Sequence, residues 1–191
     1  VHLTVEFSGK DVSLQDENGV STNDLDVEYL AIGTNGKAAA KGREAVHLRL
    51  LPATRAGFLD QGVRYVTEFQ VPPGRYQLRV AARERLGGRA GSVFYDLEVP
   101  DFAKPLLAVS DLLITSVRAA GVRTGKGSST LGAILPSPTP AHRAFTADDT
   151  LTAAVSIYDN NAEHPHALDI RATVHADDGA QEQPVTEHTM A

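Results

Sequence analysis

The sequence predicts an all-β protein built from antiparallel β-sandwich modules of the immunoglobulin or fibronectin-III type. Wherever apolar residues cluster, they alternate with polar ones, and turn sequences such as ENG, TNGK and PPG separate the alternating segments. Such alternation is typical of strands that bury one face and leave the other in water. A chain of 191 residues accommodates two sandwich modules of about 100 residues each. We therefore expect modules at residues 1–102 and 103–191.

The first module contains alternating segments that place their apolar residues on one face. These segments span residues 1–7, 25–31, 46–50, 63–71, 76–82 and 93–99. Polar side chains, among them Arg64, occupy the opposite face and are predicted to point outward. Residues 53–62 do not alternate, and we expect a short helical turn there, with Phe58 and Leu59 closing one end of the core.

The best-specified hairpin is VPPGRYQLRVAARERLGGRAGSVFYDLEV, residues 71–99. Tyr76 follows the PPG turn, as in a tyrosine corner, in which the hydroxyl group binds the backbone upstream. We predict a structural role for it. The outward side chains form a predicted interaction face that meets an acidic neighbour or a protein partner: Arg75, Arg79, Arg83 and Phe94. Phe94 marks either an interface patch or the second face of a strand buried on both sides.

The connector VPDFAKP, residues 99–105, marks the predicted boundary between the modules. Strands are expected at residues 106–117, 151–158 and 168–176, with a long mobile loop rich in Gly, Ser and Pro at about 118–144. A closed sandwich needs more strands than these. Either the second module uses a sheet edge of the first, or the chain lacks its closing strands. No second PPGxY follows residue 176, which favours the latter, an incomplete second module.

Composition excludes several classes of function. The net charge of −6, from 18 basic and 24 acidic residues, argues against nucleic-acid binding, because phosphates are bound by clustered Lys and Arg. No apolar run approaches the roughly 20 residues that span a bilayer. Since the chain has no cysteine, disulfides, thiolate metal sites and cysteine nucleophiles are excluded.

No catalytic motif is recognised, and we predict neither an enzyme nor a cofactor. The stretch AGVRTGKGSS resembles a phosphate-binding loop, but Ala120 stands at the first glycine position and Gly127 replaces the required Ser or Thr. The G-x-S-x-G pattern of a nucleophile elbow is missing. The scattered carboxylates fit a generic acidic surface.

The turn YDNNAEHPH, residues 158–166, gathers oxygen and imidazole ligands. Oxygen ligands in a turn suit Ca²⁺, but the EF-hand order is missing and these are also the residues that turns prefer. We expect no metal. The side chains that would supply ligands if one bound are Asp159, Asn161, Glu163, His164 and His166. A calcium- or small-ligand-binding accessory module is therefore the alternative function.

Three stretches resemble the carboxy-terminal region of a bacterial family, known mainly from acidobacteria, whose members carry a von Willebrand factor A-related domain. They are GVRYVTEFQVPPGRYQLRVAARERLGGRAGSVFYDLEVPDF (62–102), FTADDTLTAAVSIYDN (145–160) and IRATVHADDG (170–179). The resemblance implies a non-catalytic, extracytoplasmic module that follows an adhesion-type domain and contacts proteins or neighbouring domains of its own chain. The adhesion-type domain and a second PGxY are not in this sequence, so no metal-dependent adhesion site is transferred to it.

Overall fold

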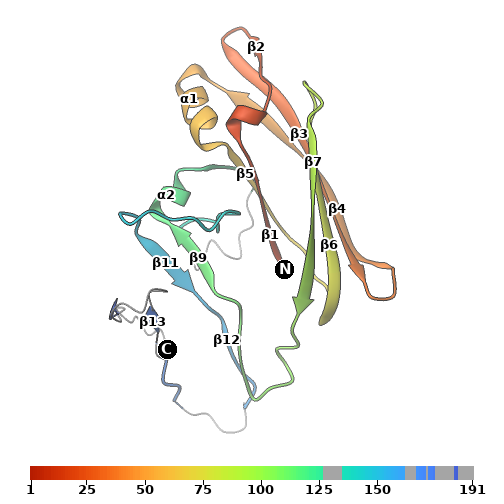
Figure 1. The fold of residues 1–191 in the computed structure, drawn as a ribbon, viewed down its shortest axis with the longest axis vertical. Helices are drawn as coiled ribbons and strands as arrows, with labels where there is room; N and C mark the ends of the chain where they lie inside the picture. Colours follow the sequence, from red (N-terminus) through yellow and green to blue (C-terminus); the bar gives the residue numbers. More distant parts are fainter. Residues whose placement is uncertain (127–134, 162–166, 171, 175–182, 185–191) are drawn as a thin grey trace.

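Two β-sheets face each other in the first half of the chain and enclose its hydrophobic core (Figure 1). The structure is a computed structural model, and it describes residues 1–126, 135–161, 167–170, 172–174 and 183–184. Strands dominate it, and nearly all pair antiparallel. The predicted all-β, sandwich-like class is confirmed, whereas the immunoglobulin or fibronectin-III type stays a prediction.

The larger sheet is organised around one long central strand, β3 (Val20–Gly33). It pairs with β4 (Ala38–Leu50) along one edge and with β2 (Gln15–Glu17) and β6 (Gly74–Glu84) along the other. β7 (Ala90–Val99) adds to the far side of β6. Asn18 and Gly19 both have positive φ, 52° and 79°, the geometry of a tight hairpin turn, and so the predicted ENG turn joins β2 to β3.

The smaller sheet contains β1 (His2–Phe7), β5 (Val63–Glu68) and β10 (Arg123–Lys126). β1 pairs antiparallel with β5, while β10 pairs parallel with β5 on its other side. A strand from the second predicted module therefore extends a sheet of the first. The division into two modules itself stays a prediction.

The core lies between the two sheets and is closed at one end by a helix. α1 (Pro52–Gln61) connects β4 to β5 and confirms the expected helical turn; η1 (Gly9–Asp11) packs beside it. Phe58 is 1% exposed, but Leu59, expected in the core, is 38% exposed because it lies on the outer side of the helix. The inward residues of the alternating segments supply most of the rest: Leu25, Val27, Tyr29, Ala31, Val46, Leu48, Leu50, Val63, Tyr65, Phe69, Leu78 and Val80.

Arg64 corrects the predicted exposure of the outer face of β5, not the orientation of the strand. The alternation places Arg64 on the face of β5 that points away from the core, yet the residue is 1% exposed. Residues 135–138 cover this outer side of β5: Leu135 and Ser137 are buried, and the carbonyl oxygen of Pro138 accepts a 3.0 Å hydrogen bond from Arg64 Nη1. β5 is thus buried on both faces by segments far apart in the sequence.

The second half forms a two-stranded ribbon rather than the continuous strands expected. β8 (Leu107–Val109) pairs with β12 (Ile157–Asp159), and β9 (Leu113–Ser116) pairs with β11 (Leu151–Ala154). β13 (Thr173–Val174) pairs with β14 (Gln183–Pro184). The range 118–144 contains β10 and all of α2 (Val117–Ala120) except its first residue, and Leu135 and Ser137 are buried there. These parts of the range pack against β5 and β9. Residues 127–134 lie outside the described residues, and the mobility of the range stays a prediction.

Candidate functional site

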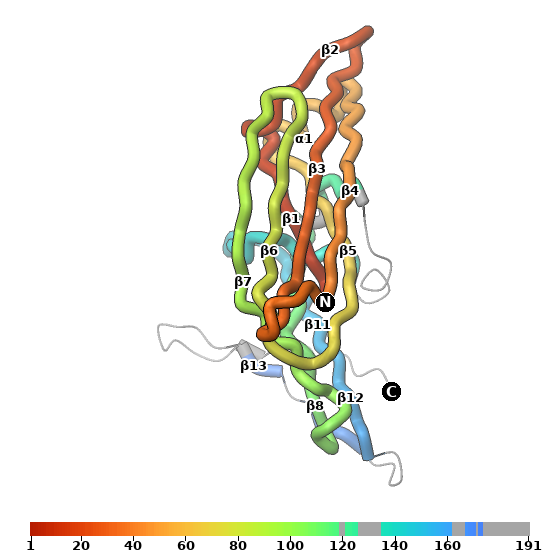
Figure 2. Tube along the Cα trace, turned by 90° about the vertical axis from the view of Figure 1, so that its right-hand side faces the viewer, coloured from red at the N-terminus to blue at the C-terminus, as the bar shows by residue number. Residues whose placement is uncertain are grey.

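β7 stands at the outer edge of the larger sheet, next to β6 (Figure 2). Among the described residues, it pairs with β6 alone. At its centre, Val93, Phe94 and Tyr95 are 62%, 63% and 63% exposed. We refer to the side of Ala90–Val99 that faces away from β6 as the β7 edge.

The exposure of β7 results from where the smaller sheet ends. Val93 and Tyr95 point to the inner side of the larger sheet, opposite Val80 and Leu78 of β6. Those two partners are buried, because the smaller sheet packs over β6. At the level of Val93 and Tyr95, burial stops between β6 and β7, whereas Leu97, nearer the end of β7, packs against the core. The alternation therefore predicted the face of Tyr95 correctly, but that face is in water.

β7 differs in chemistry from β4, the strand at the opposite edge of the same sheet. β4 carries charged side chains along its length, among them Lys41, Arg43 and Arg49. Charges on an edge strand discourage pairing with other chains. β7 carries none from Ala90 to Tyr95. Of the two strands, β7 therefore has the longer run without charged side chains, and its charges, Asp96 and Glu98, lie near its end; an uncharged, apolar edge favours strand pairing.

The residues of the predicted interaction face lie together on the outer side of β6 and β7. Three cross-strand pairs bring them there: Arg75 with Glu98, Arg79 with Phe94, and Arg83 with Ala90. The Arg79 guanidinium lies 5.4 Å from the centroid of the Phe94 ring, a cation–π distance. Arg75 Nε lies 3.5 Å from Glu98 Oε2. Phe94 is an exposed surface residue, not one buried on a second face.

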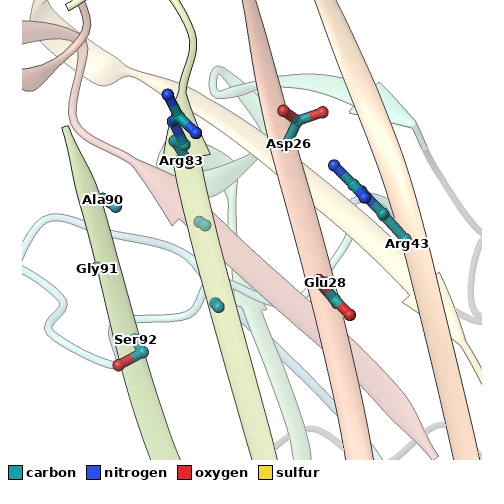
Figure 3. A pocket seen from close by; sticks show the side chains of 9 residues that line it. Asp26, Glu28, Arg43, Arg83, Ala90, Gly91 and Ser92 are labelled. Carbon is teal, nitrogen blue, oxygen red and sulfur yellow. The ribbon is translucent and has the colours of Figure 1, made fainter. Parts of the chain in front are cut away.

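A shallow hollow of about 390 Å³ lies on this outer surface (Figure 3). Small side chains of β6 and β7, including Ala90 and Ser92, line one side of the hollow. The charged side chains of Asp26, Arg43 and Arg83 also line it. Arg85 donates hydrogen bonds of 2.9 and 2.6 Å to the Asp26 carboxylate, which lower the pKa of that carboxyl group. A hollow with both signs of charge suits the charged side chains of a partner.

A second groove, of about 600 Å³, lies on the inner side between β1 and the β6–β7 hairpin. Its apolar lining includes Val5, Phe7, Val80 and Val93. Among the described residues, β1 pairs with β5 alone. The groove therefore offers an apolar surface beside the inner face of β7.

Glu84 holds the β6–β7 turn in place from inside. The residue is 3% exposed, and its carboxylate accepts hydrogen bonds from Asn23 Nδ2 at 2.6 Å and from the Ser13 hydroxyl and Arg89 N–H at 3.4 Å. Burial by itself would raise the pKa of this carboxyl group. Hydrogen bonds, including one from the Gly87 N–H, outweigh that effect, and the pKa is lowered. The hairpin that carries β7 is thus fixed at its turn.

Tyr76 stabilises the other end of the same hairpin. Its hydroxyl group donates a 2.6 Å hydrogen bond to the carbonyl oxygen of Pro72. This is the upstream backbone contact expected of a tyrosine corner. Tyr76 and Glu84 together hold both ends of β6.

The predicted metal ligands are only in part described. Asp159 lies in β12, and its Oδ1 accepts a 3.0 Å hydrogen bond from the Asn161 N–H, as in an Asx turn. Glu163, His164 and His166 lie outside the described residues. Within the part of the chain that is described, no three His, Asp or Glu residues are close enough to hold a metal ion. The expectation of no metal at this turn stays a prediction, and calcium binding stays the alternative hypothesis.

Comparison of the chain with protein-family models, curated proteins and solved structures gave no significant match. In the described part of the chain, no helix has the length and apolar character required to cross a membrane.

Proposed function

We propose that this chain is a non-catalytic protein-interaction module that binds an extended segment by strand addition at the β7 edge. The observation that carries the proposal is the exposure of Val93, Phe94 and Tyr95, consecutive residues on an edge strand without charges at its centre. We further propose that the module is extracytoplasmic and accompanies an upstream adhesion-type domain. That context rests on the resemblance of residues 62–102.

Strand addition uses groups that β7 already presents. An edge strand offers a row of N–H and C=O groups to an incoming strand, whose backbone supplies matching partners. Side chains then give specificity, because alternate residues of the added strand point to opposite faces. On the inner face they meet the apolar groove beside Val93, and on the outer face they meet Phe94 and the hollow near Arg83.

The rigidity of the hairpin supports this role. Glu84 and Tyr76 fix its two ends by hydrogen bonds to residues outside β7. An edge strand that is preorganised in this way loses little conformational entropy when a partner strand binds, which increases the affinity.

Selection of phage-displayed random decapeptides on the 191-residue chain tests the proposal. We expect selected peptides to alternate apolar and polar residues. Their affinity should fall at least about tenfold on the double variant Val93→Lys/Tyr95→Lys, because lysines at an edge oppose pairing. The matched control is Leu106→Lys, at an exposed apolar position outside β7. The selected peptides should bind this variant as tightly as they bind the wild type.

Circular dichroism and thermal melting establish that both variants are folded. The proposal fails if no peptides are enriched. It fails equally if the enriched peptides bind the double variant as tightly as they bind the wild type.

A further inference from the structure

We infer that the strand which adds to β7 is β7 of a second copy of this chain, paired antiparallel about a two-fold axis at Phe94. The inference rests on the proposed function, since it uses the same edge. It names the partner and the register.

Charge restricts the register of such a pair. Facing residues of neighbouring strands point to the same side of a sheet, so two β7 strands pair only about a residue that faces itself. With Phe94 facing Phe94, Ser92 faces Asp96 and Ala90 faces Glu98. A register centred on Asp96 places two aspartates opposite each other, and one centred on Leu97 places Asp96 opposite Glu98. Like charges directly opposite destabilise a sheet, which excludes both.

Registers centred on Val93 or Tyr95 have no such clash, but they place Phe94 opposite Ser92 or Asp96. Only the register centred on Phe94 places the exposed Phe94 ring opposite another aromatic ring, a favourable cross-strand pair.

In the register in which Phe94 faces Phe94, the Phe94 register, the two β7 strands are complementary in side-chain size and charge. The first part of β7 carries the small residues Ala90, Gly91 and Ser92, whereas its last part carries Asp96 and Glu98. Antiparallel pairing places the acidic part of each copy against the small residues of the other.

Arg83 extends this complementarity. It pairs across β6 and β7 with Ala90 and borders the hollow in Figure 3. Glu98 of the second copy faces Ala90, so its carboxylate is directed over a small side chain toward Arg83. The two-fold axis repeats the arrangement, giving two such contacts in each dimer.

The apolar centre of β7 is covered in the same register. Val93 of each copy faces Tyr95 of the other on the inner side of the sheet. The two Phe94 rings meet on the outer side, each flanked by the Arg79 of its own copy, whose guanidinium already lies 5.4 Å from the ring. Aromatic and β-branched cross-strand pairs are among the stabilising ones.

The assembly closes at two copies. A two-fold pair uses the same surface on both subunits, so both β7 edges are paired in the dimer and neither can bind a third copy. The opposite edge of each larger sheet is β4, whose charges, including Lys41, Arg43 and Arg49, discourage further addition.

Single-cysteine variants test both dimer and register, because the natural chain contains no cysteine. Directly facing Cβ atoms lie about 5 Å apart, close to what a disulfide requires. Under mild oxidation we expect Phe94→Cys to form a disulfide-linked dimer at least about tenfold faster than Val93→Cys, because residues not facing each other must first move into reach. The two positions are equally exposed.

A second measurement keeps Phe94 intact. Ser92→Cys and Asp96→Cys chains, mixed, should form a disulfide with each other, while neither should cross-link on its own. Sedimentation equilibrium of the wild type should show a mass that rises toward that of a dimer with concentration. Phe94→Lys, which places two lysines opposite each other, should raise the dissociation constant at least about tenfold.

The inference is overturned if the wild type stays monomeric up to about 1 mM, where association is worth only about 4 kcal/mol. It is also overturned if Val93→Cys cross-links as fast as Phe94→Cys, or if the mixture forms no disulfide. A monomer that still binds selected peptides at β7 would overturn self-pairing alone and leave strand addition standing. A monomer that binds none would overturn both.

Discussion

Arg64 on β5 and Glu6 on β1 form an ion pair at a register position where the two strands face each other. Arg64 Nη2 lies 2.7 Å from Glu6 Oε1, and the Arg64 side chain is fully buried whereas that of Glu6 is 26% exposed. Because Arg64 Nη1 also binds the carbonyl oxygen of Pro138, one cation connects both strands to the second half of the chain. We therefore expect the stability of the protein to depend on the ion pair between Arg64 and Glu6.

Glu6→Gln should lower the free energy of unfolding by about 2–4 kcal/mol, because it leaves a buried guanidinium without its carboxylate. The double variant Glu6→Gln/Arg64→Met should recover part of that loss, since no buried charge remains. Urea unfolding measures both. Lys104→Gln, which removes one charge of an exposed ion pair with Asp101, is the control and should change stability by less than about 0.5 kcal/mol. Equal losses in Glu6→Gln and the control would contradict the prediction.

Glu84→Gln should destabilise the protein by about 1–3 kcal/mol at pH 7, since donors that point at the carboxylate lose a charged acceptor. The pKa of Glu84 in the folded protein lies below the ordinary value of 4.5. Its contribution is therefore complete above that value and is lost as the pH falls through the folded pKa. Melting curves of wild type and variant between pH 7 and pH 3 should converge at the acid end. A gap that stays constant over this range would show that the carboxylate charge is not responsible.

Tyr76→Phe should cost about 0.5–1.5 kcal/mol, the usual net contribution of one hydrogen bond, because it removes the donor to Pro72 and keeps the ring. Thermal melting measures this difference. Tyr158→Phe is the matched control, since that ring stacks on Phe102 and the substitution preserves the stack. If the two variants melt alike, the hydroxyl of Tyr76 does not hold the turn.

The sequence predicted which face each strand turns toward the core, because that depends on the local alternation of side chains. Tyr29, Leu78 and Val80 are buried as expected. Glu84 continues the even-numbered inward series of β6, so its buried position is readable from the same pattern. The local alternation of side chains therefore predicted most of the strands in the first half of the chain and the faces that they turn toward the core.

What covers each face depends on segments far away in the chain, and alternation holds no information about them. Arg64 was expected in water, but residues 135–138 cover it. Tyr95 was expected in the core, but the smaller sheet does not reach it. The same limit applies to β10, whose parallel pairing with β5 joins distant residues. The β7 edge could be recognised only once both sheets were placed.

Two glycines near α1 should respond in opposite directions to the same substitution. A Cβ on Gly9 would stand 2.8 Å from Leu59 Cα and nearer still to the Phe58 carbonyl oxygen, both parts of the helix backbone that cannot move aside alone. Gly9→Ala should therefore cost about 1–3 kcal/mol, as overpacking does. Gly57 lies within α1 with open space around it, and Gly57→Ala should add about 0.5–1 kcal/mol by favouring the helix. Urea unfolding measures both variants. No loss of stability in Gly9→Ala would mean that η1 and α1 do not pack as closely as described, and a loss in Gly57→Ala would contradict the open space beside Gly57.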